Sequence, residues 1–195
     1  MTRIVAGQAG GRRLAVPPSG TRPTSDRARE ALFSSLDATL HGLTGVRFLD
    51  LYAGSGAVGL EAWSRGAARV VLVESAAAAV KVLRTNVTNL RSSHAPGPAG
   101  KIDVVAAKAE RTAADLPASA FDVVFADAPY DLPAVQVVGV LATLAQRGVP
   151  RPGAIIVAER ATRDKWAWPL GYAGTHDRKY GDATLHYATF DPTLL

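Results

Sequence analysis

Residues 46–59 read Val-Arg-Phe-Leu-Asp-Leu-Tyr-Ala-Gly-Ser-Gly-Ala-Val-Gly, and this stretch decides the fold. An apolar run that Asp50 interrupts near its end is followed by Gly54, Gly56 and Gly59. Such a run, closed by glycines and continued by a helical pattern, predicts a buried strand, a tight turn and the start of a helix. The glycine spacing matches the fingerprint of dinucleotide-binding folds, although a glycine-rich turn can also be purely structural.

From residue 46 onward, strand-like and helix-like patterns alternate along the chain. The pattern predicts strands near 46–51, 70–74, 103–107, 121–126 and 154–159, helices near 57–66, 76–90 and 132–146, and a closing hairpin of 175–179 with 185–190. Alternation of this kind predicts an α/β fold, in which a parallel sheet carries helices on both faces. The hairpin adds one antiparallel strand, as mixed sheets allow.

Acidic residues lie at the ends of three predicted strands: Asp50, Glu74 and Asp127. Because ligands of such sheets bind at the carboxyl ends of the strands, we expect these acids to share a site. Glu74 follows Gly54 by 20 residues, where an acid can accept hydrogen bonds from both ribose hydroxyls of an adenosine. NAD and S-adenosylmethionine both contain adenosine. A structural strand-end acid is the alternative for Glu74. Asp50 would repel a pyrophosphate and suits the cationic methionine end of S-adenosylmethionine, which favours the methyl donor.

The tetrapeptide Asp127-Ala128-Pro129-Tyr130 follows the fourth predicted strand directly. An ionised carboxylate only accepts hydrogen bonds, so Asp127 and the Ala128 carbonyl can hold both hydrogens of an exocyclic amine and keep its lone pair directed at a methyl group. Pro129 fixes the backbone after that carbonyl, and Tyr130 offers a ring on which a flipped base can stack. The tetrapeptide therefore predicts methylation of a nucleobase amine. The structural alternative is a proline-containing turn with a capping Asp and a core Tyr.

Positive charge is concentrated near the N-terminus. Residues 1–47 hold seven arginines against three acidic residues, which accounts for most of the net charge of +5. Short β-like pieces at 4–5 and 13–16 predict a hairpin, and Thr24 or Ser25 can cap a helix that ends at Gly42. Residues 1–45 are therefore predicted to be an appended module that contacts a polyanion. A solvated arginine-rich face is the alternative.

The composition is that of an ordinary globular protein, with 195 residues of which 48% are hydrophobic and 20% charged. The sequence contains no cysteine and no apolar run as long as a membrane span or a signal peptide, so we expect a cytoplasmic location and no membrane contact. The four histidines are scattered without metal-like spacing, and we expect no metal site.

The sequence resembles the class I S-adenosylmethionine-dependent methyltransferases, and more narrowly the bacterial 16S ribosomal RNA guanine-N2 methyltransferase D family. The resemblance covers nearly the whole chain. It is carried by Arg-Ile-Val-Ala-Gly at 3–7, Gly-Arg-Arg-Leu at 11–14, Arg-Pro-Thr-Ser-Asp-Arg-Ala-Arg-Glu at 22–30, Asp-Leu-Tyr-Ala-Gly-Ser-Gly at 50–56 and the tetrapeptide at 127–130. It implies a Rossmann-like sheet of seven strands, mostly parallel with the last strand antiparallel, in a catalytic domain of residues 46–195.

The resemblance also implies methylation of a guanine N2 amine in 16S rRNA, within the assembling small ribosomal subunit, by a protein that we expect to be a monomer. The implied catalytic residues are Asp127, Ala128, Pro129 and Tyr130. The implied residues at the methyl donor are Asp50, Tyr52, Ala53, Gly54, Ser55, Gly56, Glu74, Lys108, Ala109 and Asp127. The arginines expected at the RNA are Arg3, Arg12, Arg13, Arg22, Arg27 and Arg29.

Two positions depart from the family pattern. Ala128 stands where the family usually has proline, and because a backbone carbonyl is the group required there, we expect activity with a looser turn. Lys108 stands where methyltransferases often carry Asp or Asn to bind the adenine amine. Contacts to adenine are therefore expected from the backbone of residues 107–109 alone.

Three other functions compete with this interpretation. A DNA adenine-N6 methyltransferase can use the same tetrapeptide, but the short chain shows no separate target-recognition region. An NAD-dependent oxidoreductase can use the same glycine turn, and would bind the nicotinamide cofactor. A non-catalytic RNA-binding module would bind RNA without transferring a methyl group.

Overall fold

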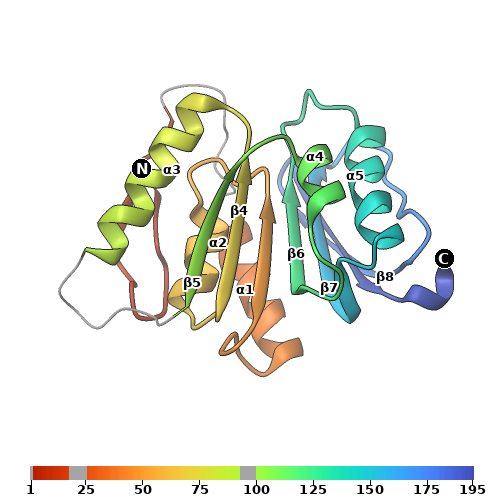
Figure 1. The fold of residues 1–195 in the computed structure, drawn as a ribbon, viewed down its shortest axis with the longest axis horizontal. Coiled ribbons are helices and arrows are strands. Elements are labelled where there is room, and N and C mark those ends of the chain that lie inside the picture. The colour runs from red at the N-terminus through yellow and green to blue at the C-terminus, as the bar shows by residue number, and fades with distance from the viewer. Residues whose placement is uncertain (1, 18–25, 93–99) are drawn as a thin grey trace.

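The computed structural model describes residues 2–17, 26–92 and 100–195, and Figure 1 shows its fold. A short antiparallel pair, β1 (Thr2–Arg3) with β2 (Arg13–Leu14), precedes a seven-stranded sheet of order β5-β4-β3-β6-β7-β9-β8. The strands of this sheet are β3 (Arg47–Leu51), β4 (Arg69–Glu74), β5 (Lys101–Ala106), β6 (Phe121–Asp127), β7 (Pro150–Ala161), β8 (Tyr172–Tyr180) and β9 (Ala183–Phe190). The helices are α1 (Asp26–Leu40), α2 (Ala57–Ser64), α3 (Ala77–Arg91), α4 (Ala109–Asp115) and α5 (Ala134–Gln146), with a short 3-10 helix at Pro192–Leu194. Within the described ranges, none of the helices combines the length and the apolar character that crossing a membrane requires.

The strand order gives the sheet a switch point beside its central strand. Strands β5, β4, β3, β6 and β7 are parallel, and β9 lies antiparallel between β7 and β8. The predicted mostly parallel sheet with an antiparallel last strand is therefore confirmed. From β3 the chain proceeds outward through β4 to β5, and then returns to the other side of β3 through β6. Doubly wound sheets bind their ligands at such a reversal.

Successive side chains of the parallel strands enter two different apolar cores. Phe48 of β3 and Val70 of β4 belong to a core shared with α1, α2 and α3, whereas Leu49 and Val71 belong to a core shared with α4 and α5. Figure 1 shows α4 and α5 together on one side of the sheet and α1 and α2 on the other. Burial on both faces requires apolar residues at nearly every strand position, which explains the continuous apolar runs of the sequence.

Some element boundaries differ from the sequence-based expectation. Helix α4 was not anticipated, because its seven residues are too few to show a helical period. Strands β7 and β8 begin earlier than predicted, at Pro150 and Tyr172. Both extensions have partners, since Pro150 pairs with Phe121 and Tyr172 pairs with Phe190. Pairing in the sheet thus lengthens strands beyond their strongest local pattern.

The N-terminal hairpin is anchored to α2 by a buried carboxylate. Glu61 is fully buried, and its two oxygens accept the N–H groups of Val5 at 2.6 Å and Ala6 at 2.9 Å. The Val5 amide therefore bonds to α2 and not to a facing strand. This explains why the ladder comprises only β1 and β2, in place of the predicted 4–5 and 13–16.

We expect Glu61→Ala to lower the free energy of unfolding by about 2–3 kcal/mol, because it leaves two backbone N–H groups without their acceptor. Urea denaturation measures this change, and limited proteolysis reports release of the hairpin. Glu30→Ala is the matched control, since Glu30 is an exposed acid on α1. Equal stability of the two variants would show that the hairpin does not depend on this contact.

Candidate active site

The chain turns sharply after β3. Tyr52 has φ 63°, a left-handed conformation that bulky residues rarely adopt, and Gly54 and Gly56 follow with φ 55° and 82°. A left-handed tyrosine costs about 1–3 kcal/mol, and strain of this kind clusters at functional sites. The turn leads directly into α2, which begins after Gly56.

Gly59 is required by packing at the start of α2. Its N–H donates to Asp50 Oδ2 at 2.8 Å. A Cβ atom added at Gly59 would lie 2.2 Å from Leu72 Cδ2 and 3.0 Å from Asp50 Oδ2. Only glycine allows the helix to approach the strands this closely. Asp50, which is 2% exposed, therefore joins β3 to the first turn of α2.

The buried Asp50 gives a pH-dependent contribution to stability. Its pKa is raised from 3.8 to about 8: burial is the largest cause, the hydrogen bond from Gly59 lowers the pKa, and the charges of Asp127 and Glu74 raise it. Between these two pH values the folded chain keeps a proton that the unfolded chain has released. The contribution of Asp50 to stability is therefore lost as the pH rises from about 4 towards 8.

We expect Asp50→Asn to flatten this dependence, because asparagine keeps an acceptor for Gly59 but does not titrate. Urea denaturation at pH 5 and pH 8 should show a larger loss of unfolding free energy with rising pH in the wild-type chain than in the variant. Identical losses in the two proteins would contradict the assignment of the raised pKa to Asp50.

Glu74 connects the glycine turn to the start of α3. Its Oε2 accepts the Gly54 N–H at 2.9 Å, and its Oε1 accepts the N–H groups of Ser75 at 2.8 Å and Ala76 at 2.7 Å. An ionised carboxylate offers about four acceptor positions. Three backbone contacts therefore leave capacity for a ligand hydroxyl, and Glu74 also holds the turn in shape.

A cavity of about 550 Å³ opens beside this turn, where β4, β3, β6 and β7 end. Most of the predicted donor and catalytic residues line it: Asp50, Tyr52, Ala53, Gly54, Ser55, Glu74, Asp127, Ala128, Pro129 and Tyr130. The three strand-end acids named from the sequence are thus brought together. Gly56 is not among the lining residues, because a Cβ there would meet Leu83 of the protein interior at 2.4 Å.

The walls of the cavity are strongly acidic. Six acidic side chains line it: Asp50, Glu74, Asp127, Asp131, Glu159 and Asp182. Among the described residues, no lysine or arginine lines the cavity. Glu159 was not predicted as a site residue, although it ends the fifth predicted strand as the other acids end theirs. It is 4% exposed and pairs in register with Asp127. The described residues contain no group of three or more His, Cys, Asp or Glu side chains able to hold a metal ion.

Arg160, which was not predicted as a site residue, donates hydrogen bonds to backbone carbonyls of the tetrapeptide and of the loop that follows it. It is 1% exposed, and its Nη1 donates to the carbonyls of Ala128 at 3.4 Å and Pro129 at 3.3 Å. Its Nη2 donates to the Leu132 carbonyl at 2.8 Å, and the same nitrogen contacts Asp164 Oδ2 at 2.8 Å. One guanidinium therefore fixes three carbonyls of the loop after β6. No local pattern around residue 160 distinguishes it from a surface arginine.

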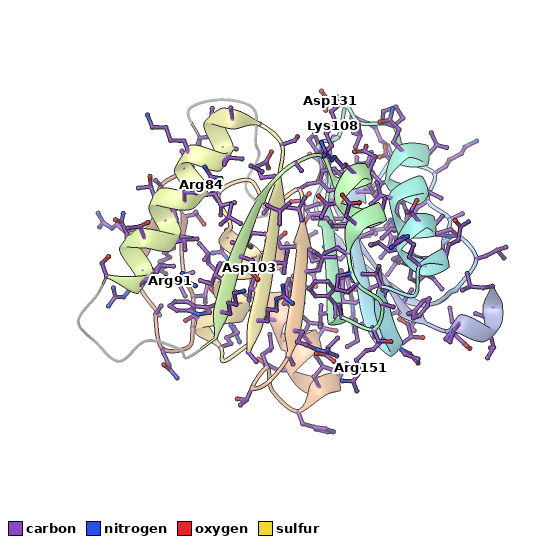
Figure 2. The ribbon with its side chains drawn as sticks, in the orientation of Figure 1. Arg84, Arg91, Asp103, Lys108, Asp131 and Arg151 are labelled. Carbon is purple, nitrogen blue, oxygen red and sulfur yellow. The ribbon has the colours of Figure 1, made fainter. Side chains whose placement is uncertain are left out.

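Lys108 and Ala109 lie at the start of α4. Lys108 is exposed, and its carbonyl accepts the Thr112 N–H at 3.1 Å, as expected for the residue before a helix. Figure 2 shows Lys108 and Asp131 at the same end of the sheet. Ala109 is buried at 3% exposure, and neither residue is part of the cavity lining. Their predicted contact with adenine remains a prediction.

The predicted RNA-contacting arginines divide into two groups. Arg3, Arg13 and Arg27 are exposed and Arg12 is half-buried. Arg29 is fully buried, and it donates to Thr2 Oγ1 at 2.9 Å and to the Arg3 carbonyl at 2.7 Å. This corrects the expectation for Arg29, whose guanidinium holds β1 against α1. Arg22, Thr24 and Ser25 lie outside the described residues.

Known proteins share this sequence pattern. The family described as conserved hypothetical protein 95 matches residues 2–189. Ribosomal RNA small subunit methyltransferase D of Escherichia coli strain K12 is 46% identical over 94 residues, which make up 48% of this chain and 46% of that protein. Putative rRNA methyltransferase YlbH of Bacillus subtilis strain 168 is 37% identical over 89 residues, or 45% of this chain and 47% of that protein. The matches span about half the length of these curated relatives.

A solved structure shares the entire fold. The putative methyltransferase yhhF from Escherichia coli is 30% identical, and the superposition covers 98% of both chains with a TM-score of 0.81. At this coverage the likeness includes the N-terminal hairpin and the closing strands as well as the central sheet.

Proposed function

The chain belongs to the family described as conserved hypothetical protein 95, and from this membership and the geometry of the cavity we propose that it is an S-adenosylmethionine-dependent methyltransferase. The proposed acceptor is the exocyclic N2 amine of a guanine in 16S rRNA. The observation that carries the reaction is the acid-lined cavity that brings together the glycine turn, Glu74 and the Asp127 tetrapeptide. The ribosomal substrate is taken from the family and from the names of the relatives.

The residues of the cavity suit this methyl donor. S-adenosylmethionine would supply an electrophilic methyl group on a positively charged sulfur, and it also carries an ammonium group. Asp50 lines the cavity beside the turn, and a bound positive charge would favour its ionised form over the protonated form that its raised pKa favours in the free chain. Glu74, with acceptor capacity left, suits the ribose hydroxyls. The pyrophosphate of NAD would meet the same carboxylates without a described lysine or arginine in the lining, which disfavours an oxidoreductase.

The tetrapeptide would orient the acceptor amine. Asp127 and the Ala128 carbonyl accept the two amine hydrogens, which leaves the nitrogen lone pair free to attack. As the new carbon–nitrogen bond forms, the methyl–sulfur bond would break and its electron pair would pass to sulfur, which leaves as a neutral thioether. The nitrogen becomes positive and releases a proton, for which Asp127 is the proposed acceptor. Tyr130 lines the cavity, where stacking on the base contributes about 1–3 kcal/mol towards the cost of extruding it.

RNA would approach over the N-terminal hairpin. Arg3, Arg12, Arg13 and Arg27 are the described arginines that remain in this proposal, since Arg29 is buried. Phosphate contacts by arginine position an RNA without reading its sequence. The proposed partner is the small-subunit rRNA, in an assembling particle, and the proposed location is the cytoplasm, where such particles form.

Incubation with labelled S-adenosylmethionine and small-subunit particles that lack the modification tests this function. We expect label on the N2 atom of one guanine, located by nuclease mapping and mass spectrometry. Duplex DNA serves as the alternative acceptor, and label on adenine N6 would replace this proposal by a DNA methyltransferase. A parallel titration with NAD tests the oxidoreductase. If the protein binds RNA but transfers no label to it, the result would support the alternative of a non-catalytic RNA-binding module.

A further inference from the structure

A second concave surface lies beside the acidic cavity. It is a groove of about 720 Å³ between α3 and the end of β5, lined by Ser75, Ala77, Val80, Lys81, Arg84, Thr85, Thr88, Asn89 and Ala106. We name it the α3 groove. Ser75 lines both the groove and the cavity, so the two surfaces meet just before α3 begins.

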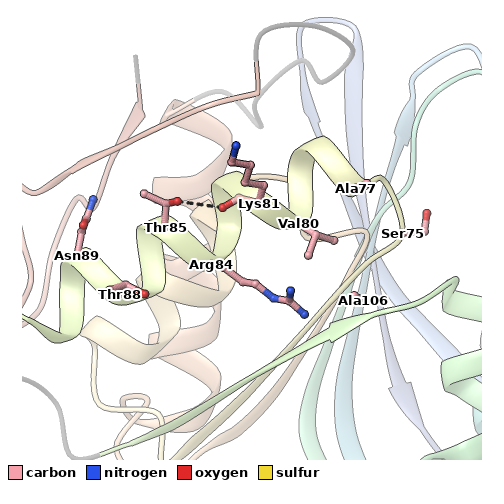
Figure 3. A pocket seen from close by; sticks show the side chains of 9 residues that line it. All are labelled: Ser75, Ala77, Val80, Lys81, Arg84, Thr85, Thr88, Asn89 and Ala106. Carbon is pink, nitrogen blue, oxygen red and sulfur yellow. Dashed lines mark hydrogen bonds between the residues drawn. The ribbon is translucent and has the colours of Figure 1, made fainter.

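The two surfaces have opposite charge. The cavity carries six carboxylates, whereas the α3 groove has two cations, Lys81 and Arg84, and no acidic lining residue among those described. Both cations are exposed, and in the described part of the chain neither forms an ion pair. Figure 3 shows Arg84 extending from α3 towards Ala106, while Lys81 projects from another side of the helix.

The remaining polar side chains of the α3 groove are neutral. They are Ser75, Thr85, Thr88 and Asn89, the side-chain types that contact phosphate and sugar oxygens alongside lysine and arginine. The Thr85 hydroxyl donates to the Lys81 carbonyl at 3.0 Å, and its oxygen lone pairs can still accept a sugar hydroxyl. Cations, hydroxyls and an amide that line one groove complement a phosphodiester backbone.

The acidic cavity makes such a surface necessary for a polyanionic substrate. A base can enter the cavity, but the phosphates on either side of it would be repelled by the carboxylates. Lys81 and Arg84 are cations on α3, the helix that follows the cavity residues Ser75 and Ala76. The N-terminal hairpin reaches the same helix, since Ala15 exchanges two hydrogen bonds of 2.9 Å with Asn86 of α3. Arg13, two residues earlier, is exposed.

We propose that the α3 groove binds the RNA phosphodiester backbone next to the nucleotide that enters the cavity. The inference rests on the proposed function for the nature of the polyanion. Lys81 and Arg84 provide the charge, and the N-terminal hairpin contacts the same helix through Ala15 and Asn86.

The salt dependence of RNA binding tests this proposal. A transcript of small-subunit rRNA is titrated with wild-type protein and with the double variant Lys81→Gln/Arg84→Gln at several salt concentrations. We expect the slope of log affinity against log salt to become shallower by about 1 for each cation removed. Donor affinity and melting temperature should stay at wild-type values, because both side chains are exposed and unpaired in the described structure.

Arg147→Gln is the matched control, since Arg147 is an exposed arginine that caps α5 at the far end of the sheet. The proposal is overturned if the double variant keeps the wild-type slope, or if Arg147→Gln changes the slope equally. It is also overturned if donor affinity falls by the same factor as RNA affinity, because the groove would then belong to the donor site. Failure of methyl transfer by the wild-type protein would refute the proposed function. The salt dependence of RNA affinity can still be measured in that case, so the two proposals fail separately.

Discussion

Asp127→Ala is expected to reduce the rate of methyl transfer by at least about 100-fold, the scale of losing a positioned acid–base group, while donor affinity changes only a few-fold. The side chain lines the cavity beside Asp50 and ends β6. In the proposed reaction it holds the amine of the acceptor and not the body of the donor. Removing it therefore affects the orientation and deprotonation of the amine.

Single-turnover transfer to small-subunit particles measures the first quantity, and calorimetric titration with S-adenosylmethionine measures the second. Asp131→Ala is the matched control, because Asp131 is an exposed acid that lines the outer part of the same cavity. Loss of donor binding as large as the loss of turnover would contradict the proposed role of Asp127 and make it a donor ligand.

Arg160→Ala is expected to lower the free energy of unfolding by about 3–5 kcal/mol, the range for breaking a buried ion pair. The substitution removes the donors to the Ala128, Pro129 and Leu132 carbonyls. It also leaves the Asp164 carboxylate without the guanidinium that it contacts at 2.8 Å. Because those carbonyls belong to the catalytic loop, the variant should also transfer methyl groups more slowly at temperatures where it is fully folded.

Arg160→Lys separates the contribution of charge from that of shape. Lysine keeps the positive charge but lacks the planar fork that reaches several carbonyls at once. We expect it to recover part of the stability and little of the transfer rate. Arg163→Ala is the control, since Arg163 is exposed three residues away. Wild-type turnover in folded Arg160→Lys would show that the fork does not position the tetrapeptide.

The central fold could be predicted because its signals are local. The apolar run before the glycines, the acid after the second strand and the tetrapeptide after the fourth each occupy a few consecutive residues. Family membership, predicted from five such segments, is confirmed by a match over residues 2–189. Helix α4 was missed because seven residues carry too little periodicity.

The acidic residues of the site were predicted better than the arginines. Strand-end acids share a signal, so Asp50, Glu74 and Asp127 were found together, and the same rule could have found Glu159. Arg29 illustrates the limit of counting charge. In the sequence it is one of seven N-terminal arginines, but it is fully buried and bonded to Thr2 and Arg3. Charge in a sequence does not tell which side of a helix is covered.

The sequence by itself determined the alternation of strands and helices apart from α4, the glycine turn and three of the acids at the strand ends, because each depends on neighbours within a few positions. Only the tertiary structure decided which residues meet across long separations. Arg160 supports carbonyls about 30 residues away, and Glu61 anchors amides 55 and 56 residues away. Those contacts depend on how the sheet and helices pack, and burial makes each unsatisfied polar group costly enough to fix its partner.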